Sequence, residues 1–207
     1  PNFEGAETAA RTLSRLREFQ SAEVVKVNPD SPQKHVREAA LRQGRRLIVP
    51  TPRLAKGFLL LEPNMIPRNS IGKASTIRGA FTYGRKIALE ELPEVDLVVA
   101  GSVAVTPEGA RVGKGGGYSE MEYGILRELK LAGEGTPIAT TVHDVQVVDE
   151  IPVEEHDFLV DLVVTPTRTI RTNRTRSQPK GIIWEEITPR MLEEMPVLKE
   201  LKKRRNP

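Results

Sequence analysis

The sequence of 207 residues contains no cysteine. It therefore cannot form disulfides, a catalytic thiol, a cysteine-ligated zinc site or an iron–sulfur cluster, and it fits a reducing compartment. No apolar run approaches the roughly 18 residues of a membrane helix, and no basic and apolar leader follows Pro1. We therefore expect a cytoplasmic protein that does not enter a membrane.

Aromatic residues are also scarce, at 4% of the chain, and none lies among the arginines of residues 168–176. Residues 168–207 hold 11 Lys and Arg against 5 Asp and Glu, whereas the whole chain has a net charge of only +3. A basic segment can bind nucleic acid, but stacking of bases needs aromatic partners. We expect a solvated basic segment, and nucleic acid is the less favoured partner.

Hydrophobic residues make up 38% of the chain and charged residues 29%, which is typical of a globular protein. The length predicts one domain, which we place at residues 1–200 with a basic tail at 201–207. We expect a monomer.

Apolar strand patterns alternate with helical patterns along the chain. Helices are predicted at 5–19, from about 31 to Gln43, at 118–131 and from Thr188. Strands are predicted at 24–27, 47–49, 58–61, 96–105, 137–142, 145–148 and 160–164. This alternation predicts a three-layer α/β/α fold with a mostly parallel, Rossmann-like sheet.

A glycine-rich segment, RVGKGGGY at 111–118, lies between a predicted buried strand and a predicted helix. Successive glycines let backbone amides approach an anion closely, and a helix N-terminus adds partial positive charge. Arg111 and Lys114 add full charges. The segment predicts a polyphosphate-binding loop formed by Gly113, Gly115, Gly116 and Gly117, with a flexible surface turn as the alternative. It matches neither of the two common nucleotide-binding templates.

RVGKGGGYSE resembles the loop of the 5-formyltetrahydrofolate cyclo-ligase family, also called methenyltetrahydrofolate synthetase. The strand DLVVAGSVAV before it, the segment VVDEIPVEEHD with Gln146 preceding it, and VDLVVTPT resemble the family in the same order. The likeness is strong over about 95–170. VNPDSPQ and PTPRL resemble the divergent branch labelled methenyltetrahydrofolate synthetase domain-containing.

The resemblance implies a sheet of the NagB/RpiA/CoA-transferase-like type. It also implies ATP- and Mg-dependent conversion of 5-formyltetrahydrofolate, or a related reduced pterin, to the 5,10-methenyl form through a phosphorylated formyl group. Arg111, Lys114 and Tyr118 would be catalytic. The nucleotide would be bound by Arg111, Gly113, Lys114, Gly115, Gly116, Gly117, Tyr118, Gln146, Ile151 and Pro152. Glu120 and Asp157 would bind magnesium.

Two departures from the family pattern support a second hypothesis. Ser119 stands where the family has a second tyrosine, and Glu120 where it has aspartate. The alternative is a non-catalytic nucleotide-binding module that binds RNA or a protein through its basic C-terminal segment. Arg11 and Arg15 are candidates for the basic residue that the family's first helix supplies.

Two His–Asp pairs and one serine have both a functional and a structural interpretation. His143–Asp144 and His156–Asp157 could form a metal site or a base with its orienting carboxylate. For His143 a hydrogen-bonded histidine at a strand end is favoured. Ser102 is more plausible as a small residue at a tight strand end than as a nucleophile.

Overall fold

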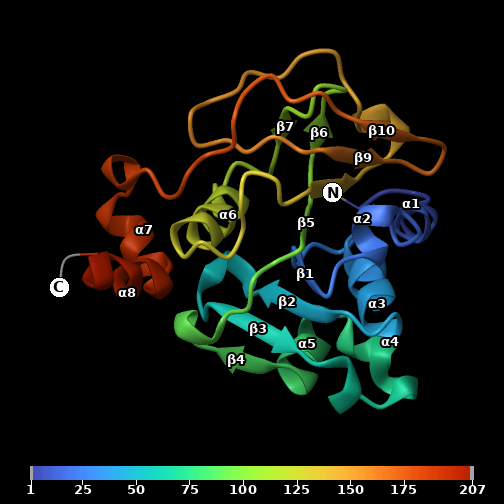
Figure 1. Cartoon of the computed structure of the whole chain (residues 1–207), viewed down its shortest axis with the longest axis horizontal. Helices are drawn as coiled ribbons and strands as arrows, with labels where there is room; N and C mark the ends of the chain where they lie inside the picture. Colours follow the sequence, from blue (N-terminus) through green and yellow to red (C-terminus); the bar gives the residue numbers. More distant parts are fainter. Residues whose placement is uncertain (1, 206–207) are drawn as a thin grey trace.

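The computed structural model describes residues 2–205 as an α/β/α sandwich around one sheet (Figure 1). In the described part, the sheet has the order β10-β9-β8-β5-β1-β2-β3-β4. Its strands are β1 Val24–Val27, β2 Arg46–Pro50, β3 Phe58–Leu61, β4 Arg85–Ile87, β5 Leu97–Ala100, β8 Ile138–Thr141, β9 Leu162–Val164 and β10 Thr169–Arg171. The five strands from β9 to β2 run parallel, and β3, β4 and β10 join antiparallel. The predicted fold class is confirmed.

The two faces of the sheet pack against different helices because side chains alternate along each strand. Val25 and Val27 face a cluster with the helices on one side. These helices are α1 Ala6–Leu13, α2 Arg17–Gln20, α3 Lys34–Arg42, α4 Ile71–Ala74 and α5 Ile77–Tyr83. Val24 faces the opposite cluster, to which α6 Tyr118–Glu128 and α8 Pro196–Arg205 contribute; α7 Pro189–Glu194 precedes α8.

The order in which strands are added to the sheet reverses between the two adjacent, parallel strands β1 and β5. From β1 the chain proceeds through α3 to β2 on one side, whereas from β5 it proceeds through α6 to β8 on the other. The connections that leave β1 and β5 therefore diverge and open a crevice at the carboxyl ends of these strands. In open α/β sheets this is the position where ligands bind.

Three predicted elements differ in the structure. The helix expected at 5–19 breaks after Leu13, where Ser14 Oγ donates to the Arg11 carbonyl at 2.8 Å. The strand expected at 96–105 divides into β5 and β6 (Ala104–Val105), because β6 leaves the main sheet to pair with β7 (Arg111–Val112). The expected strand at 145–148 is instead a 3-10 turn at Asp144–Gln146.

The C-terminal region is more structured than the sequence predicts. Helix α8 runs across the boundary drawn at residue 200, and Leu201 is buried within it. The last two residues of the predicted tail lie outside the described residues. In residues 2–205 we find no helix that is both long and apolar enough to cross a membrane.

Candidate functional site

A cavity of about 800 Å³ occupies the crevice at the carboxyl ends of β1 and β5. Its walls come from the loop after β1, the turn after β2, the start of α6 and two further loops. These segments are Asn28–Gln33, Pro52–Arg53, Gly101–Val103, Arg111–Glu122 and Ile151–Asp157. A cavity of this size can enclose a nucleotide or a comparable small molecule.

The glycine-rich segment forms the part of the wall between β7 and α6. Gly115 and Gly117 have φ angles of +81° and +65°, which side chains other than glycine rarely adopt. A Cβ on Gly116 would lie 2.6 Å from the Tyr118 ring. Gly117 is the N-cap of α6, so the loop ends where unpaired helix amides begin. The position between a strand and a helix is the one that the sequence predicted.

Lys114 lies at the mouth of the cavity. Its Nζ is 2.5 Å from Asp30 Oδ1, in the loop after β1, and its side chain is 63% exposed. This ion pair joins the glycine loop to the β1 loop across the crevice. Because the pair is exposed, it adds little to stability, and an incoming anion can compete with Asp30 for the ammonium group.

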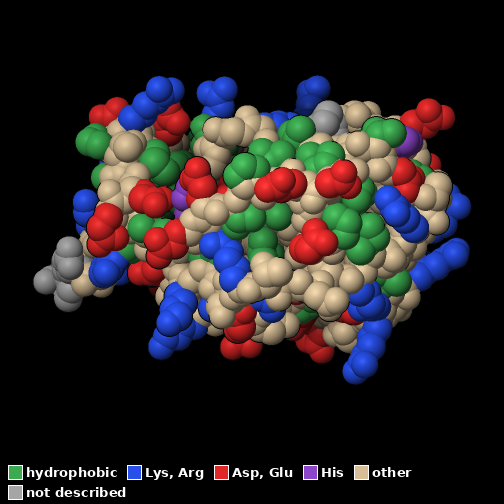
Figure 2. All heavy atoms as spheres, turned by 90° about the horizontal axis from the view of Figure 1, so that it is seen from above, with side chains coloured by type: hydrophobic (Ala, Val, Ile, Leu, Met, Phe, Trp, Pro, Cys, Tyr) green, Lys and Arg blue, Asp and Glu red, His purple; other side chains and the backbone are tan. Residues whose placement is uncertain are grey.

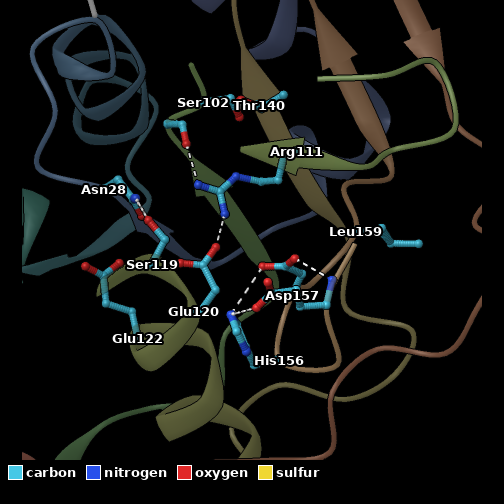
Figure 3. Close-up of polar contacts among 12 residues, drawn as sticks. Asn28, Ser102, Arg111, Ser119, Glu120, Glu122, Thr140, His156, Asp157 and Leu159 are labelled. Atoms are coloured by element: carbon cyan, nitrogen blue, oxygen red, sulfur yellow. Dashed lines mark hydrogen bonds and ion pairs between the residues drawn. The ribbon is translucent and has the colours of Figure 1, made fainter. Parts of the chain in front are cut away.

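Arg111 lines the same cavity, but its guanidinium already has partners within the protein, whereas the sequence suggested a side chain free to bind phosphate. Its guanidinium is buried, pairs with the Glu120 carboxylate and donates to the Gly101 carbonyl at 3.0 Å (Figure 3). It also lies 4.7 Å from the centre of the Phe158 ring. Arg111 therefore fixes the glycine loop to the end of β5 and to helix α6.

The two expected magnesium ligands line the cavity from different segments, Glu120 from α6 and Asp157 from the 151–157 loop (Figure 3). Glu120 is paired with Arg111, and Asp157 accepts the Glu154 amide at 2.8 Å. Residues 2–205 contain no group of three or more acidic or histidine side chains that could hold a metal. The donors fit an ion that brings its own phosphate and water ligands, which is how Mg²⁺ is commonly bound.

The other predicted nucleotide-binding residues divide into two groups. Ile151, Pro152 and Tyr118 line the cavity, and Tyr118 also donates to Glu194 at 3.3 Å. Gln146 does not line it. The amide group of Gln146 donates to the Ser102 and Val103 carbonyls at 3.1 and 3.0 Å, so it fixes the β5–β6 connection instead.

The floor of the cavity holds a polar network that the sequence did not predict. Lys26 pairs with Glu122 and donates to Asn28 Oδ1 at 2.5 Å, while Asn28 Nδ2 donates to Ser119 Oγ at 2.7 Å. Burial raises the pKa of Glu122, and the nearby Lys26 opposes that shift. Two features of the sequence could have indicated this network: the lysine in the otherwise apolar strand VVKV and the glutamate on the inner face of α6.

Gln33 supplies a second polar feature of the wall. Its amide nitrogen, Nε2, donates to Thr141 Oγ1 at 3.2 Å, whereas its Oε1 is buried and has no hydrogen-bond partner in residues 2–205. A buried acceptor without a partner is costly.

The remaining candidates lie elsewhere or have structural partners. Arg11 and Arg15 do not line the cavity. His143 Nδ1 accepts the Val145 amide at 3.2 Å, as expected for a histidine at a strand end. Ser102 lines the cavity and shares a 2.8 Å hydrogen bond with Thr140. His156 lines the cavity beside three carboxylates, and its Nδ1 is 3.0 Å from Glu186.

The arginines of residues 168–176 are engaged within the protein. Arg168 pairs with Asp144, Arg171 with Glu18, and Arg174 with Glu134 and Asp161; Arg176 donates to two backbone carbonyls. On the face seen in Figure 2, acidic and hydrophobic side chains occupy the middle and Lys and Arg lie mainly near the edge. That face presents no continuous basic patch.

The comparisons with known proteins agree with this geometry. Residues 1–166 match the model of the 5-formyltetrahydrofolate cyclo-ligase family. Methenyltetrahydrofolate synthase domain-containing proteins of Bos taurus and Mus musculus are 43% and 42% identical over 98% and 99% of the chain. The chain spans about half the length of these relatives, 54% and 56%.

A 5-formyltetrahydrofolate cyclo-ligase of Mycolicibacterium smegmatis is 35% identical over 81 residues, 39% of each protein. The fold is shared with 5,10-methenyltetrahydrofolate synthetase of Aquifex aeolicus, which superimposes with a TM-score of 0.55 at 22% identity over 84% of each chain. Because the family model matches four-fifths of the chain, this chain belongs to the 5-formyltetrahydrofolate cyclo-ligase family.

Proposed function

We propose that this protein is an ATP- and Mg-dependent ligase that converts 5-formyltetrahydrofolate, or a related reduced pterin, to its 5,10-methenyl form. The observation that carries the proposal is the glycine loop with Lys114 at the mouth of the cavity between β1 and β5. Family membership supplies the reaction class, and the cavity supplies a place where a nucleotide can bind.

The reaction needs one activation step and one ring closure. The γ-phosphoryl group of ATP is transferred to the formyl oxygen, which leaves ADP. N10 then attacks the activated carbon and loses its proton, and the C–O bond breaks to release inorganic phosphate. Phosphoryl transfer requires mainly positioning and charge neutralisation from the protein.

The residues of the cavity suit that requirement. The amides of Gly113–Gly117 and the Lys114 ammonium would hold the phosphates, after Lys114 exchanges Asp30 for a phosphate oxygen. Glu120 and Asp157 would complete the ligands of a nucleotide-bound magnesium ion, which supplies charge neutralisation.

A second candidate is a nucleotide-binding module without turnover. It is favoured by the pairing of Glu120 with the buried Arg111 and by the engagement of Ser119 with Asn28. Ser119 and Glu120, the two residues that differ from the family pattern, therefore already have partners within the protein. In this case ATP would bind at the glycine loop, but the formyl group would not be phosphorylated.

The test mixes the protein with MgATP and 5-formyltetrahydrofolate and follows the near-UV absorbance of the methenyl product. The Lys114→Ala variant should abolish the signal and weaken ATP binding. Lys73→Ala, which changes an exposed lysine on α4 outside the cavity, should leave both unchanged. ATP binding without product favours the second candidate, and absence of both binding and product refutes the proposal.

A further inference from the structure

Arg53 has an unusual backbone at the edge of the cavity. It lies in the 3-10 turn Pro52–Leu54 that follows β2, and both Arg53 and Leu54 have left-handed φ angles, 57° and 54°. Non-glycine residues seldom adopt this conformation, and two in succession are rarer still. Such strain persists only where the surrounding structure enforces it, and it is concentrated at functional sites.

The surrounding contacts enforce this turn. Leu54 is fully buried in the core below the turn. Thr51 Oγ1 donates to the Gly57 carbonyl at 2.9 Å and accepts the Lys56 amide at 3.0 Å, so the two ends of the turn are joined. The enforced backbone therefore sets the point on the cavity wall from which the exposed Arg53 side chain extends.

The other basic side chains in and below the cavity already form ion pairs within the protein. Arg111 is paired with Glu120, Lys114 with Asp30, and Lys26 with Glu122. Within residues 2–205, Arg53 makes no hydrogen bond or ion pair, and it is the only Lys or Arg lining the cavity of which that is true. Its charge is among the smaller causes that lower the pKa of Glu194, but it forms no direct contact with that carboxylate among the described residues. A guanidinium on a cavity wall without a hydrogen bond or ion pair is suited to an anion from outside the chain.

We propose that Arg53 is a specificity-determining residue that binds a carboxylate of the second substrate, the glutamate moiety of a reduced folate. This inference rests on the proposed function. Arg53 follows β2, which lies on the opposite side of β1 from β5, whose connection carries the glycine loop. The loop amides and Lys114 suffice for the phosphates, which leaves Arg53 for the other substrate.

The neighbouring wall suits the remainder of that substrate. Pro52 precedes Arg53, and Pro29 and Pro32 line the cavity from the loop after the adjacent strand β1. Rigid, apolar proline rings give a ligand with flat rings a surface to pack on, at little cost in conformational entropy. A planar guanidinium at the end of this wall can bind the two oxygens of a carboxylate together.

The test measures equilibrium binding of two ligands to the intact protein: 5-formyltetrahydrofolate and 5-formyltetrahydropteroate, which lacks the glutamate. Arg53→Ala should weaken binding of the folate about 10-fold or more, the value expected for a lost charged hydrogen bond, and leave the pteroate unaffected. Arg53→Lys should recover only part of the affinity. Arg78→Ala, at an exposed arginine on α5 whose side chain makes no hydrogen bond or ion pair among the described residues, is the matched control.

Arg53→Gly provides a variant that cannot fail merely through misfolding, because glycine accepts the left-handed conformation. It should raise the melting temperature while it weakens folate binding as Arg53→Ala does. Equal loss of folate and pteroate binding, or a loss of ATP affinity instead, would overturn the inference. If the unaltered protein binds ATP but neither pterin, the proposed substrate is wrong, and the role of Arg53 falls with it.

Discussion

The ammonium group of Lys26 and the carboxylate of Glu122 form an ion pair in the floor of the cavity, with their side chains 1% and 3% exposed. Lys26 is on the central strand β1, and Glu122 is on helix α6, which covers that face of the sheet. The pair joins the sheet to the helix that follows the glycine loop. It therefore fixes the position of α6 relative to the cavity.

Replacing one partner of this pair should be costly. Lys26→Met leaves the Glu122 carboxylate buried without its cation, which should lower the free energy of unfolding by about 3–5 kcal/mol in urea titrations. The double variant Lys26→Met with Glu122→Leu should recover most of the loss, because no charge remains buried. A double variant as unstable as the single one would show that the pair itself stabilises the fold.

Arg111 and Lys114 should differ sharply in their effect on stability, although both belong to the same loop. Arg111→Ala removes a buried partner of Glu120 and should cost about 3–5 kcal/mol. Lys114→Ala removes an exposed ion pair and should cost about 0–1 kcal/mol. Thermal and urea unfolding of the two variants would measure this; similar losses would contradict the division into an anchoring and a binding residue.

The left-handed glycines of the loop should be sensitive to a single methyl group. Gly117→Ala should lower stability by about 1–2 kcal/mol, because φ at this position is +65°. No atom lies within 4 Å of the added Cβ, so the cost is conformational only. Gly135→Ala, which also has open space but no left-handed angle, is the control and should change stability by less than about 0.5 kcal/mol.

In the proposed function Asp30, which pairs with Lys114, would compete with phosphate for that ammonium group. Asp30→Asn should therefore increase ATP affinity by up to about five-fold, which corresponds to the upper end of an exposed ion pair. Isothermal titration with MgATP and with ATP in chelator would measure it. Weaker binding in both conditions would indicate that the carboxylate itself assists the nucleotide.

The ion pair between Glu18 and Arg171 should contribute to acid stability. The hydrogen bond from Arg171 lowers the pKa of Glu18, and burial partly opposes this shift. Because the folded-state pKa lies below the unfolded value of 4.5, the contribution is present above about pH 4.5 and is lost as pH falls through the folded pKa.

Glu18→Gln should therefore flatten the pH dependence of unfolding below about pH 5, by about 1 kcal/mol or less, since Arg171 is 59% exposed. Urea unfolding from pH 3 to 7 measures the slope. Glu7→Gln, which alters an exposed pair within α1, serves as the control. An unchanged slope would show that the pair does not form in solution.

The fold and the outline of the site follow from local patterns. Strands such as 47–49 and 58–61 consist of continuous apolar runs, which a sheet covered on both faces requires. The glycine loop is recognisable because glycine adopts the left-handed angles of Gly115 and Gly117 without the strain that other residues incur. Short helices such as α4 and α5, of four and seven residues, give too few turns for a helical period and were not predicted.

What could not be predicted is the pairing of charges. The sequence places Arg111, Lys114 and Glu120 in one segment, but it does not show which of the two cations is buried. That depends on where β5 ends and where the ring of Phe158 lies. Arg53 was missed because its neighbours Pro52 and Leu54 indicate only a turn, and left-handed angles at an arginine have no local signal.

The sequence by itself determined the secondary-structure alternation, the three-layer class and the position of the glycine loop, because these depend on hydrophobic periodicity and on the freedom of glycine. Only the tertiary structure decided which charges are free. A side chain's charge is local, but its partner, burial and pKa depend on residues far apart in the chain, as with Lys26 and Glu122 or Lys114 and Asp30.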